Sequence, residues 1–334
     1  MPIDTVSQAP AFAWQPDNNE QVASDGQAVQ QTPTITPPDG NERTIAWNYH
    51  TTAEGDVSQT PDSTQTTPTG DEDVSQTPDS TQTTAGKDLE KEREASGTVK
   101  QLDQSSNLPF DQNYYKKYVE ASGIPIVASA EVGDKALLKM RDVVDTMLKK
   151  DPATREALAK NLKGILIIPK DKGMTTLPEY ANLDKTNPLP GQSWNDRAQG
   201  IGWTPSLPYV SASEANLLHS GSPQDKYPDE SIYIHEFAHA VFDAGIASRD
   251  PEARSRLNNL FADAKANGYL QNSYAASNPS EYWAEGVQAW FNAAAANGSS
   301  TTIGTNKQLH DADPNLWNEL RRWFPAPDEL THAI

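Results

Sequence analysis

The sequence has no cysteine among its 334 residues. This excludes disulfides, thiolate metal ligands and cysteine nucleophiles. No apolar run approaches the length of about 18 residues that a transmembrane helix needs, so we expect no membrane span. The first residues, Met1 to Thr5, do not form a basic segment followed by an apolar stretch. A cleaved Sec signal peptide is therefore not expected.

Positive charge is also scarce, because 27 lysines and arginines face 46 aspartates and glutamates and give a net charge of −19. Such a charge argues against nucleic acid or an anionic membrane surface as the main partner, since both need a positive patch. The excess is uneven: residues 1–108 hold 18 acidic and 5 basic residues, whereas residues 109–334 hold 28 and 22. The exclusion is thus weaker for the second part of the chain than for the first.

Residues 1–106 are poor in apolar side chains and rich in Gln, Thr, Ser, Pro, Asp and Gly. This composition predicts a long disordered acidic arm. Within it, a 12-residue unit at 56–67 recurs without change at 73–84, and each copy contains a single apolar side chain, a valine. Such a unit cannot offset an ordering cost of roughly 1–2 kcal/mol per residue. We interpret the arm as a spacer or, alternatively, as a docking segment for a chaperone or secretion machinery, with a short charged helix at 87–95.

Residues 107–334 regain aromatic and β-branched side chains and are predicted to form one domain of α+β class. Apolar periodicity predicts helices over 134–150 and from 152 to about 162. The apolar run at 164–169 predicts a strand, and the segments 200–203 and 208–211 predict one more strand or a strand pair. The last half is expected to be mostly helical, ending with a helix over 314–324.

One motif in this domain carries chemistry, the H-E-x-x-H sequence at His235, Glu236 and His239. On a helix, residues i and i+4 lie on one face, so the two imidazoles can bind one Zn²⁺. Glu236 lies beside the first histidine and can reach a water at the metal without binding the metal itself. A metal-free pair of core histidines is the alternative, but it would leave several buried polar groups without partners.

The third ligand has to come from elsewhere in the chain. The long form of the motif would need Gly at 242 and His at 245, but these positions are Phe242 and Gly245. Downstream, Asn278 and Pro279 are good first residues for a helix that carries Glu281 and Glu285 on one otherwise apolar face. Buried carboxylates are costly unless they are paired or bind metal, which favours Glu281 as a ligand. The alternative gives Glu281 only a capping-box role at the start of this helix.

Together, His235-Glu-Phe-Ala-His239 and the later Tyr274-x6-Glu281-Tyr-Trp-Ala-Glu285 resemble the gluzincin metallopeptidases. The similarity is greatest to the anthrax lethal-factor-like branch, which includes the Pro-Pro endopeptidases. It covers roughly residues 230–292. One departure is Ala238, where that branch usually has glycine.

The resemblance implies a zincin-like fold, with a small mixed sheet and active-site helices, and one Zn²⁺ per chain. It also implies a role for each matching residue. His235, His239 and Glu281 would be the zinc ligands, Glu236 the general base, Tyr274 a hydrogen-bond donor to the oxyanion, and Glu285 a partner of a ligand histidine. The substrate would lie extended along an edge strand, for which 164–168 and 200–211 are the candidates.

We therefore expect a zinc endopeptidase that acts on a protein or peptide. The alternatives are a catalytically inactive zincin-fold binding protein and a zinc amidase acting on another amide. The lysine-poor Ser/Thr/Gln/Pro-rich first segment indicates a protein that is secreted, or delivered into a host cell as an effector or toxin. The alternative location is the cytoplasm. A reporter fused to residues 1–106 that stays in the producing cell would count against export.

Overall fold

The computed structural model describes residues 98–189, 191–270, 273–294 and 303–330. The arm predicted to be disordered, the 12-residue repeat and the helix predicted at 87–95 lie outside these residues, apart from the arm's last nine positions. The described chain is a mixed α+β structure, as the sequence predicts, with a small mixed sheet and many helices. None of its helices is long and apolar enough to cross a bilayer.

The sheet has six strands in the order β1-β2-β3-β4-β6-β5. Its strands are β1 (Lys100–Gln101), β2 (Tyr115–Ala121), β3 (Ile124–Ser129), β4 (Gly164–Ile168), β5 (Gly200–Ile201) and β6 (Tyr209–Ser213). β4 runs parallel to β3 and β6, and the remaining pairs are antiparallel. The predicted strand at 164–169 is thus confirmed, and the segments near 200 and 210 form the antiparallel pair β5–β6.

The central strand β4 is buried on both faces, which explains its uninterrupted apolar sequence. Ile165 and Ile167 belong to the larger core, which lies against the helices. Leu166 and Ile168 belong to a second core, which the segment 174–201 covers. That segment contains short helical turns: η2 (Met174–Thr176), η3 (Pro178–Tyr180), α4 (Leu183–Thr186) and α5 (Trp194–Arg197).

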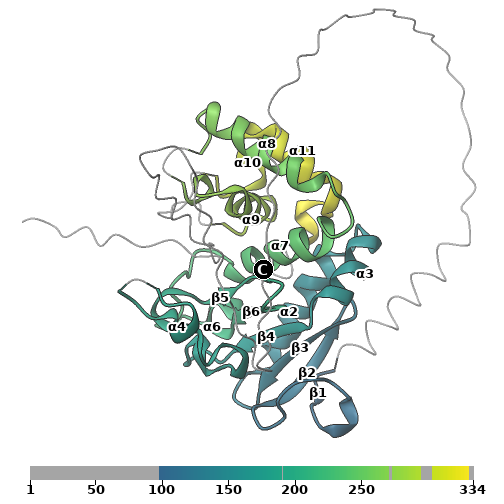
Figure 1. Ribbon diagram of the computed structural model, residues 1–334, viewed down its shortest axis with the longest axis vertical. Coiled ribbons are helices and arrows are strands. Elements are labelled where there is room, and N and C mark those ends of the chain that lie inside the picture. Colours follow the sequence, from purple (N-terminus) through teal and green to yellow (C-terminus); the bar gives the residue numbers. More distant parts are fainter. Residues whose placement is uncertain (1–97, 190, 271–272, 295–302, 331–334) are drawn as a thin grey trace, which may run out of the picture. The chain divides into compact units, whose positions relative to one another are not determined.

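The longer helices follow the predicted pattern. They are α2 (Asp134–Met147), α3 (Pro152–Asn161), α6 (Glu214–Leu218), α7 (Ile232–Ala240), α8 (Ala253–Ala266), α9 (Pro279–Trp290), α10 (Asn306–Ala312) and α11 (Pro314–Trp323). A π-helical stretch, η4 (Val241–Ile246), continues α7, and the short 3₁₀ turns η1 (Gln104–Ser106), η5 (Tyr274–Ala276) and η6 (Pro327–Leu330) complete the set. In Figure 1, α7 lies between the sheet and the C-terminal helices, so it contacts β6 on one side and α9 on the other.

The folded part of the chain begins before residue 107, the predicted domain boundary. β1 already pairs with β2 at Lys100 and Gln101, and Leu102 is buried in the second core. The polar composition of 98–106 conceals this, because β1 is an exposed two-residue edge strand that contributes no apolar pattern.

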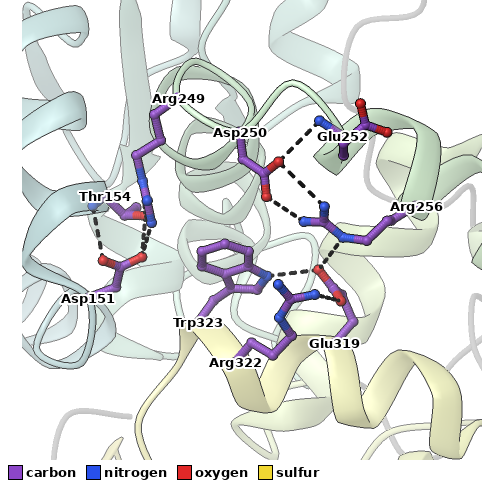
Figure 2. Close-up of polar contacts among 9 residues, drawn as sticks. All are labelled: Asp151, Thr154, Arg249, Asp250, Glu252, Arg256, Glu319, Arg322 and Trp323. Carbon is purple, nitrogen blue, oxygen red and sulfur yellow. Dashed lines mark hydrogen bonds and ion pairs between the residues drawn. The ribbon is translucent and has the colours of Figure 1, made fainter.

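A network of charged side chains joins α3 to the C-terminal helices on the surface (Figure 2). Arg249, just after η4, binds Asp151 at the start of α3 and lies over the Trp323 ring of α11. Arg256 on α8 pairs with Asp250 at 2.6 Å and contacts Glu319 of α11 at 3.5 Å. These pairs are partly exposed, so we expect each to add little to stability.

Candidate metal centre

Helix α7 carries the H-E-x-x-H motif, and all nine of its residues are buried. Its first turn has no cap from its own N-cap residue, Ser231. Instead Asn216 of α6 supplies one, because its Oδ1 accepts a hydrogen bond from the Ile232 amide at 2.9 Å. The Asn216 amide group also donates to the carbonyl oxygen of Glu230 at 2.9 Å. A side chain distant in sequence therefore fixes the start of the helix.

Helix α9 brings the second part of the site against α7. Asn278 caps α9 by accepting hydrogen bonds from the amides of Ser280 and Glu281 at 2.9 and 3.0 Å. Pro279 is its first residue, as predicted. The Trp283 indole donates to the carbonyl oxygen of Ala238 at 3.0 Å, which fixes the two helices to each other. The cap comes from Asn278 alone, so the capping-box alternative for Glu281 is wrong.

The Glu281 carboxylate points at the two histidines of α7. Its Oε2 lies 3.0 Å from His235 Nε2 and 3.6 Å from His239 Nε2. One ligand atom from each of the three residues lies within 4.8 Å of the other two, and all three side chains are buried. The structure thus assembles the three predicted ligands into one group that could bind a metal ion.

The donor set fits a dication. His239 Nε2 and Glu236 Oε2 are buried without a hydrogen-bond partner among the described residues, which is costly unless a bound species interacts with them. Two imidazoles and one carboxylate form a set that zinc prefers, with an open position left for water or substrate.

The charges of the group agree with this geometry. Burial raises the pKa of the Glu281 carboxyl, but His239 and His235 outweigh burial and lower it to about 2. Burial lowers the pKa of His235, but its hydrogen bond to Glu281 and the charge of that carboxylate raise it to about 10. Without metal, a proton therefore lies between imidazole and carboxylate, where a metal ion would replace it.

Glu236 faces the strand β5. Burial raises the pKa of its carboxyl to about 7, and the charges of His235 and His239 act against this rise. Gly200 and Gly202 flank this carboxylate because no side chain fits there. A Cβ on Gly200 would lie 2.8 Å from Glu236 Cγ, and one on Gly202 would lie 2.9 Å from His239 Cβ. The two glycines thus let the strand backbone approach the motif. The sequence Gly200-Ile201-Gly202 could have indicated this close approach.

Tyr274 lies in η5 beside the same group, with its ring centroid 6.4 Å from that of His235. Burial raises the pKa of its hydroxyl, and the charges of Glu281 and Glu236 raise it further. The hydroxyl therefore keeps its proton at neutral pH and can donate a hydrogen bond.

Two α9 side chains that sequence reasoning missed hold the outer nitrogens of the histidines. Gln288 Oε1 lies 2.8 Å from His235 Nδ1, and Ser280 Oγ lies 3.1 Å from His239 Nδ1. Glu285, the predicted partner, lies 3.6 Å from His235 Nδ1, beyond hydrogen-bonding distance, and burial raises the pKa of its carboxyl to about 8. Spacing offered a clue to Gln288, because it lies seven residues after Glu281 on the same helix face.

Of the two candidate substrate strands, 164–168 is excluded. It forms β4, in the middle of the sheet between β3 and β6. β5 lies at the end of the strand order and pairs with β6 alone among the described strands, so 200–211 stays the candidate. No protein-family model matches this sequence, and no curated protein is similar enough to it to count as a relative.

Proposed function

We propose that this protein is a zinc-dependent endopeptidase with a zincin-like domain of the gluzincin type. The observation that carries the proposal is the buried group of His235, His239 and Glu281, whose ligand atoms lie within 4.8 Å of one another beside the Glu236 carboxylate. A bound zinc ion supplies a Lewis acid that makes water nucleophilic near neutral pH and stabilises developing negative charge.

The residues of the chain then have distinct tasks. Glu236 accepts the proton of the attacking water and returns it to the leaving amine. Its raised pKa supports this, because a general base works best when its pKa lies near the working pH. The protonated hydroxyl of Tyr274 donates to the oxyanion that forms on the substrate carbonyl, a contribution often worth about 3 kcal/mol. The outer edge of β5 is the candidate position for the substrate backbone.

Two other functions remain candidates, an inactive zincin-fold binding protein and a zinc amidase. The first would be expected to lack the base or a ligand, whereas Glu236 and all three ligands are present. Export of the protein stays a prediction that rests on the composition of residues 1–106.

The proposal is tested with the full chain. Purified protein should contain about one zinc per chain by metal analysis, because three protein ligands make one site. It should cleave members of a random peptide library, and a chelator should stop cleavage. Glu236→Gln should keep the zinc but lose cleavage by at least about 100-fold, because it removes only the base.

The outcomes separate the candidates. A folded, active preparation without metal would contradict the zinc reaction. Zinc-loaded protein that cleaves no peptide would favour the binding protein. Cleavage of non-peptide amides alone would favour the amidase, and cleavage retained by Glu236→Gln would assign the base to another residue.

A further inference from the structure

Gln288 is fully buried between α7 and α9 and contacts the first histidine of the motif. Its Oε1 lies 2.8 Å from His235 Nδ1, whereas Glu285 Oε1 lies 3.6 Å from that nitrogen. Glu281, Glu285 and Gln288 follow one another at intervals of four and three residues along one face of α9. The face of α9 that carries the predicted ligand Glu281 therefore also carries Gln288, which contacts Nδ1 of the predicted ligand His235.

The orientation of the Gln288 amide is determined by its second contact. Its Nε2 lies 3.3 Å from the carbonyl oxygen of Ser231, an atom that can only accept a hydrogen bond. Nε2 also lies 3.5 Å from a carboxylate oxygen of Glu230. A flipped amide would set two oxygens against each other at Ser231. The amide nitrogen must therefore face Ser231, which leaves Oε1 to face His235.

This orientation has a consequence for the imidazole. Because Oε1 can only accept, His235 Nδ1 must carry the proton and donate it. The ring nitrogen that faces Glu281 and His239 is Nε2, so Nε2 is the atom that releases its proton and gives its lone pair when a metal binds. Ser280, at the corresponding nitrogen of His239, has a hydroxyl that donates or accepts, so it does not select a tautomer in this way.

The backbone holds the amide in place. The Ser231 amide donates to the carbonyl oxygen of Ala293 at 2.9 Å, which joins the start of α7 to the chain just after α9. A neutral amide also suits the surroundings. Glu230, Glu236, Glu281 and Glu285 are all buried, so another carboxylate here would raise the cost of charge burial.

We propose that Gln288 is a positioning residue that fixes the Nδ1–H tautomer of His235 and so presents Nε2 to the metal. The inference rests on the proposed function only in taking that metal to be zinc. It assigns to a neutral amide the task that a carboxylate often performs for ligand histidines, and it gives Glu285 a lesser part than the sequence predicts.

The test measures zinc affinity of the full chain by competition with a chromophoric chelator. Gln288→Met keeps the length of the side chain but removes the acceptor, and should weaken zinc binding by about 10- to 100-fold. Gln288→Glu restores an acceptor for His235 but sets a carboxylate oxygen against the Ser231 carbonyl, so it should recover only part of that loss. Glu285→Gln is the matched comparison on the same face and should cost less than Gln288→Met. Thermal unfolding of the metal-free variants shows whether each is folded.

A second measurement does not depend on any variant. In the zinc-loaded wild type, ¹⁵N NMR of the imidazoles should show a His235 Nδ1–H that exchanges slowly with water. Absence of that proton, or Gln288→Met binding zinc as tightly as the wild type, would overturn the inference. So would a larger loss from Glu285→Gln. Wild-type protein that binds no zinc would instead overturn the proposed function.

Discussion

Glu236 and Glu281 lie on adjacent helices, yet the pKa values of their carboxyl groups are shifted in opposite directions. Burial raises the pKa of Glu236 to about 7, whereas the two histidines overcome burial at Glu281 and lower its pKa to about 2. Two carboxyls with separated pKa values can do different work at one pH. Glu281 stays ionised and suits ligation, and Glu236 can exchange a proton near neutrality.

A pH profile follows from the pKa of Glu236. The base acts when deprotonated, so turnover should fall as the pH drops through its pKa. Nearby positive charge lowers this pKa, and a bound dication adds to that effect. The acid limb of kcat should therefore lie between about pH 5 and 7. Zinc content measured over the same range is the control, and a zinc-loaded enzyme with a flat kcat from about pH 5 to 8 would contradict the assignment.

Helix α9 is the element on which most of the site depends. It contributes Glu281, Ser280, Glu285 and Gln288, and its first turn is held by one side chain, Asn278. Because the amide of Glu281 is one of the two groups that Asn278 caps, the position of the ligand and the stability of the helix end are linked.

Asn278→Ala should lower the free energy of unfolding by about 1 kcal/mol, because two amides lose their acceptor. Denaturant unfolding of the metal-free protein measures this, and chelator competition should show weaker zinc binding as well. Thr305→Ala provides the matched control. Thr305 caps α10 in a capping box away from the metal centre, so this variant should lose similar stability but keep its zinc affinity. If Asn278→Ala bound zinc as tightly as Thr305→Ala, the cap of α9 would not affect metal binding.

At the scale of the whole molecule, the described residues share two cores on opposite faces of one sheet. The larger core includes the helices of the candidate metal centre. The second core closes the other face and includes Leu102, only 5% exposed, whose amide donates to the carbonyl oxygen of Lys116 at 2.8 Å. The residues just before 107 therefore belong to the folded part, although their composition does not show it.

Two truncations test this boundary. A chain that starts at residue 98 should unfold cooperatively with nearly the stability of the full chain. A chain that starts at residue 107 loses β1 and the burial of Leu102, and should be less stable by about 2 kcal/mol. Denaturant unfolding compares the two. Equal stability would return the boundary to residue 107, and failure of the longer fragment to fold would show that residues 1–97 contribute to the fold.

Local patterns in the sequence were sufficient to predict many elements of this structure. The apolar run at 164–169 predicted β4, and the Asn278-Pro279 pair predicted the start of α9. Residues i and i+4 share a helix face whatever the fold, so the spacing of His235 and His239 predicted two imidazoles side by side. Glu281 was identified because a buried carboxylate on an apolar helix needs a partner.

Other features were decided only when distant segments packed together. Periodicity fixes which face of a helix is apolar, but not how far one helix is rotated or shifted against another. That shift brings Gln288, and not Glu285, within hydrogen-bonding distance of His235. The strand order makes β4 central and β5 an edge, and neither segment shows this in its own sequence. The sequence by itself identified the candidate ligands and their helices, whereas the tertiary structure determined which side chains contact those candidates, because such contacts join residues far apart in the chain.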